Sequence, residues 1–452
     1  MAPESVAGRT LRLFVPLAVV VLAAVLRLAG LGTPDRMYFD EQFYADDAHE
    51  SLERGVEVER PAHPPLGKWL IAAGIAALGF DPVGWRVVAA MAGTLTVLVT
   101  YLIGLRLFGS VVVAGLSAAL LALDGLAITM SRIAMLDVFL MLFVATAVSM
   151  LLLDHDRGEP RWRLLAGVAF GCAVATKWSG VLALGVAVVL VAAAEATAER
   201  PRAERARRLL TAVAVPLVVV PFVVYVASWT GWFANYERSE TGRERCRAGS
   251  CAGGVIDVAD AWIDEQVELF DFQRQLEATH QYRSSPQHWP LLSRPVLFYF
   301  ERCDAVPATV SGGATNGGAC VVAPGNRARI LGLGSPAVWW PGVVALVVVA
   351  FVALRRRSWP ALVIAGFAFG QYLPWFASWK PGFSFYLLPA TPFVCLALGW
   401  MAWRTAARRR WLVLFALLVP ALAAMVYFRP LWYGHETSVA DQNERLWFDS
   451  WR

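Results

Sequence analysis

The sequence has little charge and almost no lysine. Charged residues make up 17% of its 452 positions, against about 25% in a typical soluble domain. Only three residues are lysine, at positions 68, 177 and 380, so nearly all basic side chains are arginine. Apolar residues make up 58% of the chain, whereas a single soluble core stops growing at about 250–300 residues. This composition excludes an ordinary soluble enzyme.

Long apolar runs without charges predict a chain that crosses a membrane many times. A helix needs about 20 predominantly apolar residues to cross a hydrocarbon layer of ~30 Å. The breaks between the runs define eleven candidate spans, at 12–31, 84–107, 111–130, 133–153, 163–177, 179–197, 209–232, 337–354, 359–378, 384–403 and 411–428. The expected fold is an all-α integral membrane protein, with residues 1–452 forming a single polytopic domain.

The arginines predict the orientation of these spans. They cluster in short connections, at 200–208, 355–357 and 404–410. Short arginine-rich loops between spans are typical of the cytoplasmic side, and this placement argues against nucleic-acid binding. The N-terminus is then cytoplasmic, and the longer polar segments 32–83, 233–336 and 429–452 lie outside. The same alternation requires a helical hairpin within 163–197, turning at Lys177–Gly180.

The cysteines and one helical pattern concern the large outer segment. The six cysteines are Cys172, Cys246, Cys251, Cys303, Cys320 and Cys395. Four of them fall in 233–336, and an even number outside the cytoplasm predicts two disulfides, joining Cys246 to Cys251 and Cys303 to Cys320 if pairing is local. Free thiols are the alternative. Residues 255–277 predict an amphipathic helix, lying on the membrane or packed on its own loop.

Ionisable residues at one edge of the membrane are candidates for chemistry. Such residues are costly within or beside a span and commonly mark functional sites. They gather toward the outer side, at Arg27, Asp40, Glu41, Asp124, Arg132, Asp137 and the three lysines. An ion or proton relay needs acids through the depth of the bilayer, but the middle of most spans carries none. The arrangement favours a transferase that acts on a lipid phosphate.

Five ordered blocks of sequence resemble the protein O-mannosyltransferase family. They are an arginine ending the first span followed by YFDE (38–41) and HPPLGK (63–68), then LDGLAITMSRIAMLD (123–137), ATKWSG (175–180), HQYRSSPQHWPLLSRP (280–295) and FYLLPATPF (385–393). Two features depart from the family pattern. The outer loop of about 100 residues leaves no room for the β-trefoil MIR domain of eukaryotic members, which indicates a bacterial type. Lys380 and Phe385-Tyr386 stand where an arginine and a Tyr-His pair are expected.

The resemblance implies a glycosyltransferase with the GT-C fold and about eleven membrane helices. Its donor would be polyprenyl-phosphate mannose. Its acceptors would be Ser and Thr hydroxyls of secreted or membrane proteins, which it could meet during their translocation. The active site would face the outside of the cell membrane, with the catalytic motif on 32–83.

The chemistry assigns roles to the candidate residues. An attacking hydroxyl must lose its proton to a base, and the resemblance implies Asp40, because the FDE motif of the family matches at this position. In-line displacement would invert the sugar. Glu41 would orient the acceptor or sugar, or form an ion pair with Arg27. Fixed cations stabilise a departing phosphate, and these are expected at Arg27, Arg132, Lys68 and Lys177. Acceptor or sugar contacts are expected at His63, Asp124, Asp137, His280, Tyr282, Trp289 and Tyr386.

Several of these residues have simpler interpretations. Asp40 could merely cap a helix, and Arg132 could reach for the membrane surface. Lys68 and His63, beside a rigid Pro-Pro pair, could anchor lipid headgroups. Asp124 could be an intramembrane partner of an arginine.

We expect no metal cofactor. His280 and His288 match no standard zinc spacing. Asp40, Glu41, Asp46 and Asp47 could hold Mg²⁺ or Mn²⁺ through oxygen ligands, but lysine and arginine can replace a metal at a phosphate. Two other functions remain open: a related transferase acting on a glycolipid or cell-wall acceptor, and a secondary transporter. The transporter would need broken helices at the midplane and an internal repeat, neither of which is evident in the sequence.

Overall fold

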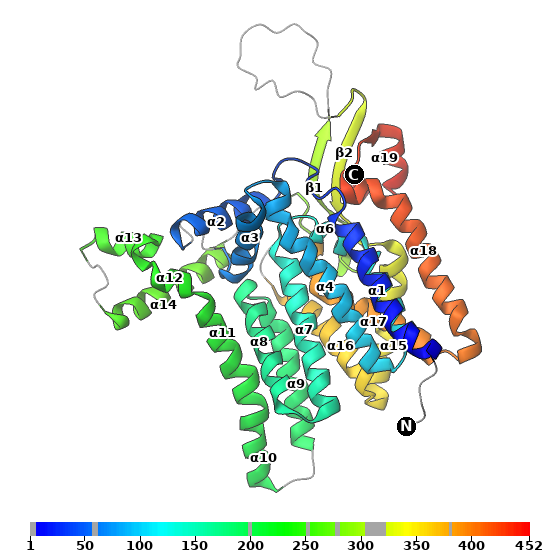
Figure 1. The fold of residues 1–452 in the computed structure, drawn as a ribbon, viewed down its shortest axis with the longest axis horizontal. Coiled ribbons are helices and arrows are strands. Elements are labelled where there is room, and N and C mark those ends of the chain that lie inside the picture. Colours follow the sequence, from blue (N-terminus) through cyan, green and yellow to red (C-terminus); the bar gives the residue numbers. More distant parts are fainter. Residues whose placement is uncertain are drawn as a thin grey trace, which may run out of the picture.

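A computed structural model describes residues 6–56, 62–197, 201–249, 254–275, 281–302, 322–378 and 382–452. The chain folds into a bundle of long, roughly parallel helices, with shorter elements gathered at one end (Figure 1). The helices of the first half are α1 Val6–Leu28, α2 Glu41–Arg54, α3 Leu66–Leu78, α4 Pro82–Phe108, α5 Val111–Ala122, α6 Gly125–Ser131, α7 Leu136–Arg157, α8 Pro160–Thr176, α9 Gly180–Thr197, α10 Arg202–Leu209, the π-helix η1 Leu210–Val219 and α11 Val220–Ser228. The second half has α12 Thr230–Ala234, α13 Glu240–Arg247, α14 Val255–Gln275, β1 Val296–Arg302, β2 Asn326–Gly332, α15 Pro336–Arg356, α16 Trp359–Tyr372, α17 Thr391–Arg404, α18 Ala407–Tyr433, β3 Thr437–Ser438 and α19 Val439–Arg445.

All eleven predicted spans are mainly helical. Within the described residues, nine helical segments are long and apolar enough to cross a membrane, and the bent pair α5 and α6 makes a tenth. The eleventh prediction corresponds to α8, which has 17 residues. The chain is therefore a multi-pass membrane protein, and the predicted hairpin is confirmed because α8 ends at Thr176 and α9 begins at Gly180.

The bend between α5 and α6 is a feature that the sequence did not reveal. The two helices meet at 61° across a break of two residues. The statement that no broken helix is evident was therefore wrong. The break lies at Leu123 and Asp124, and the Asp124 carboxylate accepts a hydrogen bond from Ala127 N, at the start of α6.

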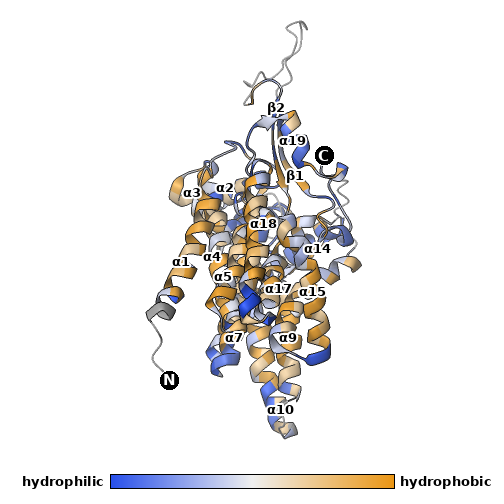
Figure 2. Ribbon diagram, turned by 90° about the vertical axis from the view of Figure 1, so that its right-hand side faces the viewer, coloured by the Kyte–Doolittle hydropathy of each residue, from blue (hydrophilic) through white to orange (hydrophobic). Residues whose placement is uncertain are grey.

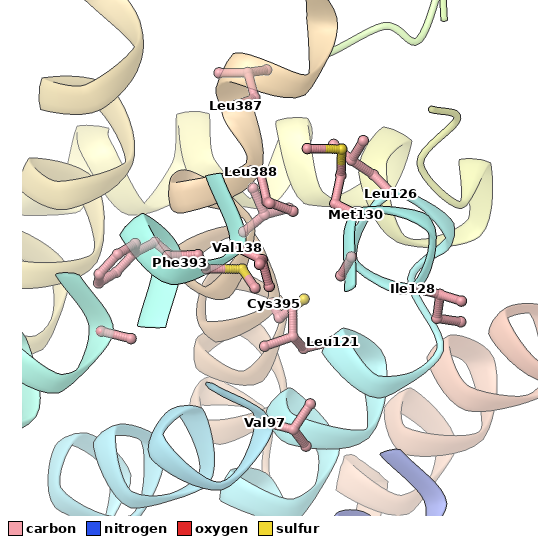
Figure 3. Close-up of a cluster of buried hydrophobic side chains, with 14 of the residues drawn as sticks. Val97, Leu121, Leu126, Ile128, Met130, Val138, Leu387, Leu388, Phe393 and Cys395 are labelled. Atoms are coloured by element: carbon pink, nitrogen blue, oxygen red, sulfur yellow. The ribbon is translucent and has the colours of Figure 1, made fainter. Parts of the chain in front are cut away.

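The bundle is apolar along its length and polar at its two ends (Figure 2). Its core lies where α4, α5, α6, α7 and α17 meet, and α17 is almost entirely covered by its neighbours. Figure 3 shows side chains from these helices and from the segment before α17 in one cluster: Val97, Leu121, Leu126, Ile128, Met130, Val138, Leu387, Leu388, Phe393 and Cys395. This core holds the turns on which the candidate site is built.

The predicted outer segments lie together at one end of the bundle and contain more structure than expected. The first holds α2 and α3, and the large segment holds α12 to α14 together with β1 and β2 (Figure 1). β1, β2 and β3 form an antiparallel sheet in that order, with a bulge between Leu297 and Tyr299. An all-α expectation did not include this sheet, although its strands carry the β-branched and aromatic residues that favour it.

The cysteine predictions are met in part. Cys246, in α13, is disulfide-bonded. Cys251, Cys303 and Cys320 lie outside the described residues, so the pairing itself stays a prediction. Cys172 and Cys395 are free, as expected for cysteines inside spans.

Helix α14 confirms that residues 255–275 are helical and packed on their own loop, and contact with the membrane stays a prediction. Ala261 and Leu269 are buried, and the Trp262 ring meets the ring of Trp229, just before α12, edge to face at 6.3 Å. One face of α14 therefore packs on its own loop. The opposite face exposes an apolar stripe, at Ile256, Ile263, Val267 and Phe270. Such a face beside the bundle suits contact with the membrane surface.

A buried ion pair joins the first outer segment to the bundle. Glu41 begins α2 and Arg86 lies in the first turns of α4, and both are fully buried. Arg86 Nε lies 2.8 Å from Glu41 Oε1, and Nη2 lies 2.9 Å from Oε2. The other guanidinium hydrogens bind the carbonyls of Leu31, Pro34 and Arg36. This pair fixes the connection from α1 to α2.

Removing one partner of this pair should destabilise the protein strongly. Arg86→Met leaves the Glu41 charge buried without its cation, which typically costs about 3–5 kcal/mol. The matched control is Arg36→Met, because Arg36 forms an exposed ion pair with Glu301, and such pairs contribute about 0–1 kcal/mol. Chemical unfolding of both variants in detergent measures the difference; equal losses would show that the pair does not hold the fold.

Candidate active site

Asp40 lies at the start of α2 with its carboxylate available. The preceding residue, Phe39, has a φ of 55°, a left-handed conformation that is uncommon for a bulky side chain and often marks functional sites. Its ring packs at 4.8 Å from that of Phe298 in β1. Asp40 occupies the N-cap position of α2, but its side chain makes no capping hydrogen bond. The simple capping role is therefore not what the structure shows.

A buried ion pair lies next to Asp40. Lys177, in the turn between α8 and α9, places Nζ 2.9 Å from both carboxylate oxygens of Asp137 at the start of α7. Burial raises the pKa of Asp40 to about 6; the Lys177 charge lowers this pKa and the Asp137 charge raises it. A carboxylate with such a pKa is ionised at neutral pH and still able to take up a proton, as a general base requires.

A second buried pair lies further along α2. Lys68 Nζ is 3.0 Å from Asp47 Oδ2, and both side chains are almost fully buried. Between the pairs lies Tyr44, whose ring is 6.1 Å from that of His63. Burial, with Asp40 and Asp137 nearby, raises the pKa of Tyr44, so its hydroxyl stays protonated and can donate a hydrogen bond.

Aromatic rings form a wall beside Lys177. The Tyr386 ring lies 4.7 Å from Lys177 Nζ and 6.0 Å from the ring of Trp289. Trp375, which the sequence analysis did not single out, lies 4.6 Å from Tyr386. Trp289 is buried and donates through Nε1 to Ser284. Flat rings beside a cation and a carboxylate are suited to packing on a sugar face.

Arg27 and Arg132 are engaged with backbone carbonyls. Arg27 is fully buried and donates to Leu121 O, Ala122 O and the Ser131 hydroxyl, all at 3.3 Å. Arg132 donates to the carbonyls of residues 27, 29 and 30 at 2.8–2.9 Å. Its guanidinium lies 4.4 Å from the Tyr433 ring. Arg27 therefore closes helix ends and has no surface for a donor phosphate, and it is not the partner of Glu41.

Asp124, a candidate for contact with the acceptor or sugar, is also hydrogen-bonded within the helix bundle. Its second oxygen accepts hydrogen bonds from Ser335 N at 2.9 Å and from Trp339 Nε1 at 3.0 Å, both at the start of α15. The residue is fully buried. Asp124 therefore ties the bend between α5 and α6 to α15, where it would touch no sugar.

The remaining candidate residues lie away from this cluster or outside the described residues. His280 and Lys380 lie outside the described residues. Tyr282 packs on the edge of the main core and lies near Arg329. In the described ranges, no group of three or more His, Cys, Asp or Glu side chains could hold a metal ion. Metal independence stays a prediction.

Arg86 is the functional residue that the sequence analysis missed. It lies two residues inside a predicted span, where an arginine is costly. An arginine at such a position could have been recognised from the sequence as a candidate functional residue. The Glu41 carboxylate that it holds also accepts a hydrogen bond from Ala134 N at 3.0 Å, in the turn before α7. Arg86 therefore links the motif bearing Asp40 to the turn bearing Asp137.

Comparison with known proteins identifies the family of this chain. Residues 80–234 match the family described as dolichyl-phosphate-mannose-protein mannosyltransferase, and residues 258–451 match the C-terminal four-transmembrane region of protein-O-mannosyltransferase. The polyprenol-phosphate-mannose–protein mannosyltransferase of Mycobacterium tuberculosis is 31% identical, over 96% of this chain and 91% of that protein.

Solved structures support the fold. The S. cerevisiae protein O-mannosyltransferase Pmt1-Pmt2 complex bound to the sugar donor has a TM-score of 0.79 at 16% identity, covering 100% of this chain and 95% of that one. ArnT from Cupriavidus metallidurans bound to undecaprenyl phosphate has a TM-score of 0.58 at 15% identity, covering 96% and 78%. The fold is thus of the GT-C type, and the chain belongs to the protein O-mannosyltransferase family of membrane glycosyltransferases.

Proposed function

We propose that this enzyme transfers mannose from polyprenyl-phosphate mannose to Ser or Thr hydroxyls of proteins outside the cytoplasm, with Asp40 as general base. The name of the relative from Mycobacterium tuberculosis gives polyprenol-phosphate mannose as donor and protein as acceptor. Ser and Thr as the accepting residues follow from the family resemblance. One observation carries the assignment of the base: the Asp40 carboxylate caps no backbone group and lies beside the Lys177–Asp137 pair.

The chemical step follows from these groups. Asp40 takes the proton of the acceptor hydroxyl as its oxygen attacks the anomeric carbon. The bond from that carbon to the phosphate oxygen breaks, and the lipid phosphate leaves with one additional negative charge. Attack opposite the leaving group inverts the sugar. The proton ends on Asp40, so no covalent enzyme intermediate is needed.

Cations near Asp40 would stabilise the leaving phosphate. Lys177 is the nearest, and its ammonium is a compact charge that can bind phosphate while remaining near Asp137. Lys68, beside Asp47, is the second candidate. Arg132 is bound to three carbonyls, which favours a structural role with the phosphate as a further contact. With such cations the step requires no metal.

The proposed side of the membrane rests on charge. Helix α10 and the arginine-rich connections after α15 and α17 lie at the end of the bundle opposite α2 and the sheet (Figure 1). Arginine-rich short loops favour the cytoplasm. The distribution of arginines therefore supports an extracytoplasmic position for Asp40.

Replacing Asp40 with asparagine should abolish most transfer without abolishing donor binding. The amide keeps the shape but cannot accept the proton, and general-base assistance is worth about 10²–10⁴-fold. Asp35→Asn, in the same connection and exposed, is the matched control with near-normal rates. Two quantities are measured for each variant: the rate of transfer of labelled mannose to a Ser/Thr peptide, and the affinity for the donor. Near-normal transfer by Asp40→Asn would remove this residue from the mechanism.

The transfer rate should depend on the ionisation of Asp40. Only the ionised carboxylate accepts a proton, so the rate should fall as pH drops through about 6, the raised pKa of Asp40. Rates of the purified enzyme from acidic to neutral pH measure this inflection, with the residual activity of Asp40→Asn as control. An inflection at the ordinary value for aspartate, about 4, would contradict a buried base.

Labelling of introduced cysteines tests the orientation. His435→Cys lies after α18 at the end with the candidate site, and Arg357→Cys lies in the connection after α15; both positions are exposed. An impermeant thiol reagent should label position 435 in intact cells and position 357 only after permeabilisation. The reverse pattern would place Asp40 in the cytoplasm.

A further inference from the structure

The connection between α1 and α2 runs alongside strand β1. Three side-chain contacts join residues 36–39 to the strand: Arg36 with Glu301 at 3.3 Å, Tyr38 with Tyr299 at 5.7 Å between ring centres, and Phe39 with Phe298 at 4.8 Å. Along these contacts the residue number rises in the connection by as much as it falls in β1, so the two segments run antiparallel. In the described residues the sheet consists of β1, β2 and β3, so side chains rather than a strand pairing hold the connection against β1.

The last of these contacts lies where the chain turns away from β1 into α2. Phe39 has a φ of 55°, and the next residue, Asp40, is the N-cap of α2. A left-handed conformation is unfavourable for a bulky side chain and persists only where the surrounding structure holds it. The Phe39 ring packs edge to face on that of Phe298. This contact therefore holds the turn that directs the Asp40 carboxylate.

The Phe298 ring belongs to a cluster that reaches the ion pair of the candidate site. Phe385 lies in the short helix η5, Ser384–Ala390, and is buried like Phe298. Its ring lies 6.0 Å from that of Phe39 and 5.8 Å from that of Phe298. Lys177 Nζ lies 5.9 Å from the same Phe385 ring. The rings that hold the turn thus also border the cation beside the proposed base.

Strand β1 is itself fixed to the helix bundle. It pairs with β2 in antiparallel register from Val296 to Arg302, with one bulge. β2 in turn packs on α6 and α18, and its residues Ile330 and Leu331 are buried there. β1 can therefore act as a rigid support for the connection that carries the catalytic motif.

We propose that Phe298 is a positioning residue for the transfer reaction: its ring holds Phe39 in the left-handed conformation and thereby sets where the Asp40 carboxylate lies. This inference rests on the proposed role of Asp40 as general base. Phe298 acts through Phe39 and needs no contact with a substrate. A base must lie within hydrogen-bond reach of the hydroxyl that it deprotonates, so the precision of this turn matters for the rate and not for binding of the donor.

Truncation of the ring tests this role. Phe298→Ala should lower kcat about 10- to 100-fold, as expected for a base displaced by ~1 Å, with donor affinity nearly unchanged. Phe300→Ala is the matched control, because it removes an exposed ring from the same strand, and both quantities should stay near normal. Phe298→Leu keeps most of the buried volume and should show a smaller loss of the same kind. Normal kcat in both Phe298 variants, or equal losses in Phe298→Ala and Phe300→Ala, would overturn the proposal.

A double-mutant cycle with Asp40→Asn separates positioning from a general loss of stability. Residues that act as one unit have strongly non-additive effects, so Phe298→Ala should have little further effect on kcat once Asp40 is asparagine. A purely structural role would lower kcat by the same factor in both backgrounds, and this result would overturn the positioning role while leaving the base in place. Near-normal transfer by Asp40→Asn alone would instead remove the base itself, and this inference with it.

Discussion

The Glu41–Arg86 pair is the contact on which the arrangement of the site depends. A buried ion pair is stable only if its remaining donors and acceptors are also hydrogen-bonded. Here Arg86 also donates to three loop carbonyls, and Glu41 also accepts from the amide of Ala134. Because Asp40 immediately precedes Glu41, fixing one residue fixes the other. The same contact holds the turn before α7, which carries Asp137. A single arginine in α4 therefore sets the positions of two carboxylates that lie far apart in the sequence.

The cations of this end divide between structure and chemistry. Arg27 and Arg132 donate hydrogen bonds to backbone carbonyls at the ends of helices. The planar guanidinium, with several N–H donors, is suited to this role. Lys177 and Lys68 instead face carboxylates next to Asp40 and Tyr44. In a chain with three lysines, two are buried against carboxylates at this end of the bundle, and one of these two lies beside the proposed base. This placement fits a phosphate site. Asp124, by contrast, serves the bend between α5 and α6.

The sequence predicted what depends on local pattern. Apolar runs identified the spans, the alternation of arginines required the hairpin at Lys177–Gly180, and the family motif located Asp40. Partners across long separations were not predictable: Arg27 was the alternative partner considered for Glu41, but its ion-pair partner is Arg86, 45 residues away. The hydrogen-bond donors of Asp124 could not be predicted for the same reason, because they lie 211 and 215 residues away. The sheet was missed because its strands sit in a long polar segment without a clear alternation.

The pH at which the transfer rate falls, measured in two variants, tests most directly whether Asp40 acts as base beside the Lys177–Asp137 pair. Lys177→Gln removes the charge that lowers the pKa of Asp40, and Asp137→Asn removes one that raises it. The account predicts that the inflection of transfer rate with pH moves up in Lys177→Gln and down in Asp137→Asn. An inflection that stays in place in both active variants would contradict it.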